Sequence, residues 1–76
     1  MEDNRLPWMI GARIAYLRKL RRWDQERLAK ETGLSRSYIS KLETGEAGAG
    51  TPIETYITIA DIFGLPLWKL VKIEED

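Results

Sequence analysis

Hydrophobic positions follow a helical spacing along the chain. Ile10, Ile14 and Leu17 are separated by four and three residues, which places their side chains on one face of an α-helix. Pro7 suits the first turn of such a helix, so the pattern predicts a helix over about residues 7–21. No segment shows the strict alternation of apolar and polar residues that is typical of a β-strand. The sequence therefore predicts an all-α fold.

Two short helices are predicted next, each between a capping residue and a glycine. Asp24 is a good N-cap for a helix over residues 25–31, which ends before Gly33. Ser35 is a good N-cap for a helix that runs through residue 44 and stops at a second glycine. The apolar residues of the pair are Leu28, Ala29, Leu34, Ile39 and Leu42. A small residue where the helices cross, a glycine in the turn and apolar inward positions together predict a helix-turn-helix unit over residues 25–44.

The C-terminal third predicts two further helices. Thr51-Pro52-Ile53-Glu54 has the pattern of a capping box with proline at the first helical position, and the helix that it opens is expected to run through Phe63. A shorter helical segment is expected over residues 66–71, before an acidic tail at residues 74–76. The intervening stretch at residues 46–50 is too rich in glycine to be expected as helix.

Composition narrows the possible chemistry. With 76 residues the chain is expected to form one domain, residues 1–76. It contains no cysteine and no histidine, so the usual general base and the preferred zinc ligands are missing, and we expect neither an enzyme nor a metal or other cofactor. The first residues lack the basic and apolar regions of a signal peptide, and no apolar stretch is long enough to span a membrane. A cytoplasmic protein is therefore predicted.

Charge is distributed unevenly although the formal net charge is +0. Residues 13–41 carry nine basic and three acidic side chains, whereas residues 46–76 carry two basic and six acidic ones. A local excess of six positive charges over the predicted helix-turn-helix unit is typical of a surface that binds an anionic partner.

The same residues resemble the Cro and lambda-repressor-like (XRE-type) helix-turn-helix family. The resemblance runs from Ile10 to Leu70 and is carried by Ile10-Gly11-Ala12-Arg13-Ile14, Gln25, Leu28-Ala29, Gly33-Leu34-Ser35, Tyr38-Ile39-Ser40-Lys41-Leu42-Glu43 and Ile59-Ala60. It implies a compact five-helix domain that binds double-stranded DNA, commonly as a dimer on a pseudo-palindrome, with its third helix in the major groove. The chain departs from the family in having Arg22 where a glycine is usual, Arg27 where a capping box has an acidic residue, and a longer loop at residues 46–50.

Candidate base-reading residues lie on the polar side of the third predicted helix. At about 100° per residue, the side opposite Ile39 and Leu42 carries two serines, a lysine and a threonine, with an arginine at its N-terminal rim. Arginine and lysine reach guanine O6 and N7 in the major groove, and small hydroxyl side chains let a helix approach base edges. We therefore predict that bases are read by Arg36, Ser37, Ser40 and Lys41; an ordinary solvated helix face is the alternative.

Contacts to the DNA backbone are expected from other side chains. Gln25 resembles the phosphate-binding glutamine of the family, and it opens a helix whose free N–H groups favour an anion. Tyr38 lies on the flank of its helix, where its hydroxyl can reach a phosphate or its ring can pack into the core. Thr44, at the end of the same helix, is the third candidate.

Two charged residues are expected to pair inside the fold. Arg18 and Glu43 each lie about 40° from the apolar stripe of their own helix, so both point toward a neighbouring helix. The family resemblance implies the same ion pair between the first helix and the end of the recognition helix.

A homodimer is predicted through the C-terminal third. If the fourth helix buries Ile53, Tyr56, Ala60 and Phe63, then Ile62 is exposed, and Leu67 and Trp68 are adjacent bulky residues of which at least one faces outward. The predicted interface is therefore Ile62, Leu67 and Trp68. The alternative is that Trp68 folds back onto Phe63 and Leu70.

The favoured function is sequence-specific binding to double-stranded DNA by a transcriptional regulator of the repressor type. An antitoxin or a restriction-modification controller shares the fold, and an interaction adaptor that kept the fold is a further alternative, favoured by the neutral net charge. The sequence gives no sign of a small-molecule ligand pocket.

Overall fold

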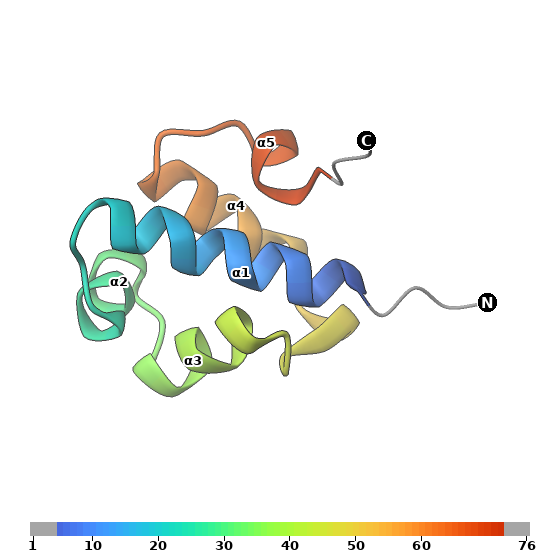
Figure 1. Ribbon diagram of the computed structural model, residues 1–76, viewed down its shortest axis with the longest axis horizontal. Helices are drawn as coiled ribbons and strands as arrows, with labels where there is room; N and C mark the ends of the chain where they lie inside the picture. Colours follow the sequence, from blue (N-terminus) through green and yellow to red (C-terminus); the bar gives the residue numbers. More distant parts are fainter. Residues whose placement is uncertain (1–4, 73–76) are drawn as a thin grey trace.

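The computed structural model describes residues 5–72, and within that range all regular structure is helical. The elements are α1 (Arg5–Leu20), α2 (Gln25–Thr32), α3 (Arg36–Thr44), a 3-10 turn η1 (Gly48–Gly50), α4 (Ile53–Ile62) and α5 (Leu67–Val71). The long helix α1 crosses the molecule, with α3 below it and α5 above it in Figure 1. The predicted all-α, five-helix fold is confirmed; the acidic tail at residues 74–76 lies outside the described residues.

All five helices contribute to one hydrophobic core. The buried apolar side chains are Ile10, Ile14, Leu28, Ala29, Ile39, Leu42, Ile59, Ala60, Phe63 and Leu70. The inward positions predicted for the first three helices are therefore confirmed, with Leu17 and Leu34 half-buried against this core. Burial of these side chains is the main force that holds the short helices α2 and α3 in place, because isolated helices of this length are unstable in water.

A glycine lets α1 approach the recognition helix closely. A Cβ atom on Gly11 would collide with the carbonyl oxygens of Leu42 and Glu43 at the end of α3. The backbone of α1 therefore packs directly on the last turn of α3, which fixes where that turn lies.

The turn after α1 contains the one non-glycine residue with a positive φ in the described range. Arg22 has φ 59°, its N–H donates to the carbonyl of Lys19, and the N–H of Trp23 donates to the carbonyl of Arg18. This is the Schellman arrangement, whose left-handed position usually holds glycine. Arg22, which stands where the family usually has glycine, therefore adopts a backbone conformation that costs residues with a side chain about 1–2 kcal/mol. The helix itself begins at Arg5, two residues before the predicted start.

The predicted capping box of α4 is wrong, and its predicted inward face is confirmed for Tyr56, Ala60 and Phe63 but not for Ile53. No side-chain hydrogen bond caps this helix at Pro52, and the Thr51 hydroxyl donates instead to the carbonyl of Gly48 (2.9 Å). The core position that the prediction missed is Ile59, which is fully buried. Ile62 is three residues further on and packs beside it, half-buried rather than exposed, whereas Ile53 lies about 120° from Ile59 and is 57% exposed.

The glycine-rich segment is also more regular than predicted. Residues Gly48–Gly50 form one 3-10 turn, closed by a hydrogen bond from the N–H of Thr51 to the carbonyl of Gly48 (3.3 Å). Ala47 packs against the core just before it. A single turn of this kind fixes few residues, so a glycine-rich stretch can adopt it when a neighbouring side chain anchors it.

Candidate nucleic-acid interface

The two helices of the helix-turn-helix unit are bounded by the capping residues that the sequence predicted. Gly33 takes the left-handed conformation (φ 78°) and its N–H donates to the carbonyl of Ala29 (2.8 Å), which ends α2. The Ser35 hydroxyl accepts from the N–H of Tyr38 (3.1 Å) and starts α3. Leu28 and Ile39 are fully buried between the two helices and the remaining core. The angle between α2 and α3 is thereby held from both sides of the turn.

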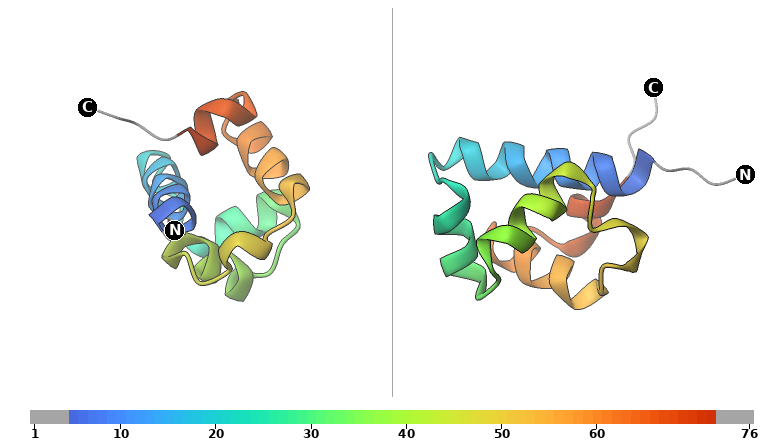
Figure 2. Two further views of the ribbon diagram at one scale, coloured as in Figure 1. Left: turned by 90° about the vertical axis from the view of Figure 1, so that its right-hand side faces the viewer. Right: turned by 90° about the horizontal axis from the view of Figure 1, so that it is seen from below.

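The recognition helix α3 presents a polar surface along one edge of the molecule. It forms the lower edge in Figure 1 and lies across the face seen from below in Figure 2 (right). Arg36, Ser37 and Lys41 are exposed there and Ser40 is half-buried, so all four predicted base-reading residues reach the surface to some extent. Arg36 and Lys41 are the charged side chains exposed on this helix, and both are cations.

The three side chains predicted to contact the DNA backbone differ in how far each is already hydrogen-bonded or buried within the protein. The Thr44 hydroxyl donates to the carbonyl of Lys41 (3.3 Å) and accepts from the N–H of Glu46 (3.4 Å), which helps to end α3. Tyr38 is half-buried and packs against the core, the second of the two positions that the sequence left open for it. Gln25 donates from Nε2 to Glu43 Oε1 (3.0 Å), a contact that the sequence did not reveal.

The start of α2 borders a polar depression on the same side as the recognition helix. It is lined by Arg18, Asp24, Gln25, Glu26 and Arg36. Asp24 caps the helix by accepting from the N–H of Arg27 (2.8 Å), so the predicted cap is confirmed. Two carboxylates and two guanidinium groups thus line this depression together with Gln25.

Beneath this depression lies the predicted ion pair. Arg18 Nε is 2.7 Å from Glu43 Oε2 and Arg18 Nη2 is 3.0 Å from Glu43 Oε1, a side-on arrangement with two parallel hydrogen bonds. Arg18 is only 8% exposed, and its Nη1 donates to the carbonyl of Trp23 (2.7 Å). The hydrogen bond with Glu43 raises the pKa of Arg18 against the opposing effect of burial. Arg18 therefore stays charged, and the pair joins α1, the following turn and the end of α3.

Several cations of the basic segment also contact other parts of the fold. Arg21 Nη1 donates to the carbonyl of Ile62 (2.9 Å), and its guanidinium lies over the rings of Trp23 and Phe63. Arg27 pairs with Glu31 (2.8 Å), and its guanidinium also lies over the ring of Trp23. Arg18 is buried, and Arg21 and Arg27, although exposed, are already engaged by other groups of the fold. The sequence count therefore overstates the number of unengaged cations that this segment offers to DNA.

The described residues were also compared with the requirements of a metal site and of a membrane-spanning helix. Within residues 5–72 no three acidic, histidine or cysteine side chains gather closely enough to hold a metal ion. No helix in that range combines the length and apolar character needed to cross a membrane.

Comparison with known proteins places this geometry in a family. The sequence matches the helix-turn-helix family over residues 14–67. The restriction-modification controller protein C.AhdI from Aeromonas hydrophila is 27% identical, with a TM-score of 0.74 over 83% of this chain and 92% of that chain. The hypothetical transcription factor NHTF from Neisseria shares the fold at 24% identity, with a TM-score of 0.79 over 93% of this chain and 80% of that chain. A search of curated proteins finds no match.

The family match spans more than half of the chain and includes all of α2 and α3. It also includes the Arg18 and Glu43 partners of the buried ion pair and the core residues of α4. The chain therefore belongs to the helix-turn-helix family of DNA-binding transcriptional regulators.

Proposed function

We propose that this protein is a homodimeric, repressor-type regulator that recognises a specific DNA sequence with α3. The observation that carries the proposal is the charge on the exposed side of that helix. Arg36 and Lys41 project from it, while its one carboxylate, Glu43, is turned inward against Arg18. A helix face with exposed cations and no exposed carboxylate suits the electronegative major groove.

Direct readout is assigned to the two cations and two hydroxyls of α3. Arg36 and Lys41 are exposed and long enough to reach guanine O6 and N7. Ser37 and the half-buried Ser40 lie beside them and allow the helix backbone to approach the base edges. Sequence preference would then come mainly from Arg36 and Lys41.

Positioning on the DNA backbone is assigned to Gln25, Tyr38 and Thr44. One N–H of the Gln25 amide is engaged by Glu43, which leaves the second N–H for a phosphate oxygen near the N-terminus of α2. Tyr38 has its ring against the core, so only its hydroxyl would reach a phosphate. Because Gln25 is held by the same carboxylate as Arg18, its position relative to α3 is fixed before DNA arrives.

Dimer formation is assigned to the C-terminal helices. Trp68 on α5 is 58% exposed, which favours the interface interpretation over a side chain folded back into the core. Leu67 and Ile62 are half-buried and would contribute only their outer atoms, whereas Ile53 and Ile57 on α4 are 57% and 41% exposed. Pairing through this end would set two recognition helices about 34 Å apart, one turn of B-DNA.

Selection of bound sequences from a random duplex pool tests the proposal. We expect a consensus with two-fold symmetry. For random duplex DNA, the logarithm of the binding constant should fall linearly with the logarithm of salt concentration. Repression follows if the selected site overlaps a promoter and the protein excludes polymerase from it in a transcription assay. Failure to enrich any sequence, with salt-independent binding, would point instead to an interaction adaptor.

Restriction-modification control is the second candidate. It is favoured by the likeness to C.AhdI, which covers 92% of that controller at 27% identity. The two candidates differ in which genes the selected site precedes. A site upstream of adjacent endonuclease and methyltransferase genes, bound with high affinity, would support the controller function.

A further inference from the structure

A second surface of the molecule, lined by no residue of the recognition helix, has the features of a protein-binding groove. The groove lies between α1 and α5 and has a volume of about 530 Å³. We infer that it binds an acidic amphipathic helix of a partner protein, with apolar side chains against α1 and carboxylates toward α5. This interaction goes beyond DNA binding and does not depend on it.

The α1 wall of the groove is an apolar stripe that faces solvent. Trp8, Ala12 and Tyr16 follow one another at four-residue spacing and all line the groove, and Leu20 continues the spacing. Trp8 is 60% exposed, while Tyr16 and Leu20 are each 62% exposed. Large aromatic side chains in one row on a single helix exceed the scattered apolar residues of an ordinary surface, and they are typical anchors at protein interfaces.

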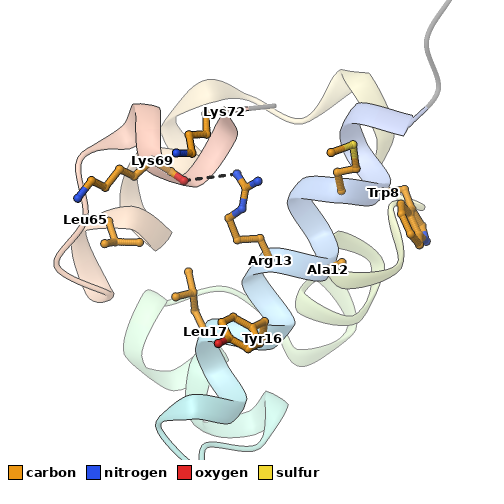
Figure 3. A pocket seen from close by; sticks show the side chains of 9 residues that line it. Trp8, Ala12, Arg13, Tyr16, Leu17, Leu65, Lys69 and Lys72 are labelled. Atoms are coloured by element: carbon orange, nitrogen blue, oxygen red, sulfur yellow. Dashed lines mark hydrogen bonds between the residues drawn. The ribbon is translucent and has the colours of Figure 1, made fainter. Parts of the chain in front are cut away.

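The floor of the groove is part of the folded core. Leu17 and Leu65 are half-buried, and both pack against the buried cluster. Figure 3 shows them on opposite sides of the groove, one on α1 and the other just before α5. The groove is therefore formed before a partner arrives, which lowers the ordering cost of binding.

The exposed walls of the groove favour a helix over a small molecule. Sites for small ligands bury most of the ligand surface, about 70–90%. Trp8 and Tyr16 each keep more than half of their surface exposed and do not close over the groove. An open apolar channel beside a helix fits a second helix, which is about 10 Å across and presents anchors at i, i+4 and i+7.

Charge complementarity identifies the chemistry of the partner. Arg13, Lys69 and Lys72 line the groove, and none of its described lining residues is acidic. Arg13 is held in place because its Nη1 donates to the carbonyls of Leu70 (2.5 Å) and Lys69 (3.4 Å), as the dashed line in Figure 3 indicates for Lys69. Arg13 is thus held against the α5 side, where Lys69 and Lys72 lie beside the ring of Trp68. Cations on this side and apolar groups along α1 match a helix with one acidic edge and one apolar edge.

The groove is placed so that a partner and DNA can bind together. In Figure 1, α5 and α3 lie on opposite sides of α1, and the end-on view in Figure 2 (left) also shows them apart. The backbone of Trp8 lies against Gly45, just after α3, but none of the residues assigned to DNA contact lines the groove. The groove is therefore suited to recruiting a protein to DNA that α3 already occupies.

Binding of a designed helix tests the inference on the full chain. The probe is a fluorescent peptide of about 18 residues, long enough to be helical, with leucines at i, i+4 and i+7 and glutamates along one edge; the comparison peptide has lysines in their place. We expect saturable binding of the acidic peptide, at least about tenfold tighter than the lysine peptide by fluorescence anisotropy. Trp8→Ala with Tyr16→Ala should weaken it about tenfold. Lys69→Glu should reduce the preference for the acidic peptide, because Arg13 and Lys72 remain as the cations of the groove.

The control and the opposing outcomes separate this surface from others. Lys30→Ala removes an exposed cation on α2, outside the groove, and should leave peptide affinity unchanged. All variants should retain their helical circular dichroism, and the double alanine variant should also retain its DNA affinity. Equal affinity for both peptides, or no saturable binding of either, would overturn the inference. So would tight binding of single-stranded oligo-dT that Trp8→Ala abolishes, or a dimer that dissociates on the same substitution. If the double alanine variant fails to fold, the charge reversal at Lys69 still decides.

Discussion

Arg18 and Glu43 meet side-on between α1 and the last turn of α3, with Nε and Oε2 2.7 Å apart. The same carboxylate accepts from Gln25 (3.0 Å), and the same guanidinium donates to the carbonyl of Trp23 (2.7 Å). One buried pair therefore joins the recognition helix, the start of α2 and the turn after α1. The positions of Gln25 and α3 relative to each other depend on it.

Removing either partner of this pair should destabilise the fold strongly. Arg18→Ala or Glu43→Ala leaves a buried charge without its partner, which typically costs about 3–5 kcal/mol. The double variant should lose less than the sum of the two, because neither charge is then left alone. Urea denaturation followed by circular dichroism measures all three. Arg27→Ala is the matched control: its pair with Glu31 is exposed, and its loss should cost only about 0–1 kcal/mol. Additive losses for Arg18 and Glu43 would contradict the coupling.

Base readout should be separable from backbone contact. Arg36→Ala or Lys41→Ala should each cost about 1–3 kcal/mol on the selected site and much less on random duplex DNA. Gln25→Ala should weaken binding to both by a similar factor, because a phosphate contact carries no sequence information. Titrations at fixed salt compare the two DNAs. Lys30→Ala, an exposed cation on α2 outside the assigned set, is the control. Equal losses on both DNAs for Arg36 and Lys41 would make them phosphate contacts.

The arginine in the Schellman turn should be replaceable with a gain in stability. Arg22 has φ 59°, which glycine adopts without the steric cost that a side chain imposes. Arg22→Gly should therefore raise the free energy of unfolding by about 0.5–1 kcal/mol, after the extra unfolded-state entropy of glycine is subtracted. Arg22→Ala keeps the strain while removing the charge, so it should change little. Equal effects of the two substitutions would show that the backbone conformation is not the source.

The sequence predicted the helix-turn-helix unit well because its signals are local. Asp24 and Ser35 each cap their own helix, and Gly33 and Gly45 end them, so the boundaries depend on hydrogen bonds within a few residues. The Arg18–Glu43 pair was also predictable, since both residues lie beside the apolar stripe of their helices. Where short-range chemistry decides the structure, one sequence is sufficient.

Features that depend on long-range packing were predicted less well. The apolar residues of α4 surround most of that helix, so periodicity alone did not show that Ile59 faces inward and Ile53 outward. Arg13 and Arg21 were counted as surface charge, yet their partners are carbonyls 57 and 41 residues away in the chain. The row of Trp8, Ala12 and Tyr16 had a visible four-residue spacing, but only the position of α5 makes it a groove wall.

Close contact between α1 and α3 should make Gly11 intolerant of any side chain. A Cβ at this position would collide with two backbone carbonyls, which cannot move aside as a flexible side chain can. Gly11→Ala should therefore lower the free energy of unfolding by about 1–3 kcal/mol or more, despite the better helix propensity of alanine. Gly50→Ala is the control, because beyond its chain neighbours no atom lies within 4 Å of the place a Cβ would take, and it should be neutral or slightly stabilising. A stable Gly11→Ala variant would mean that the helices separate at little cost.

Dimerisation should depend on the exposed tryptophan of α5. Trp68 is 58% exposed, with the cations of Lys69 and Lys72 near its ring, and burying an aromatic side chain of this size at the centre of an interface commonly contributes about 2 kcal/mol or more. Trp68→Ala should thus raise the dimer dissociation constant about 30-fold or more in sedimentation equilibrium, with helical content unchanged.

A second substitution tests whether the interface includes α4, and a third tests α1. Ile57→Glu places a charge on an exposed position and should dissociate the dimer, whereas Ile62→Glu would also disturb the core against which Ile62 packs. Tyr16 on α1 is about as exposed as Trp68, and Tyr16→Ala should leave the dimer intact. Loss of the dimer should reduce affinity for a two-fold symmetric site far more than for a half-site, since only the former engages both recognition helices. A wild-type protein that stays monomeric at high micromolar concentration, both free and on DNA, would refute the dimer, and dissociation by Tyr16→Ala would move the interface to α1.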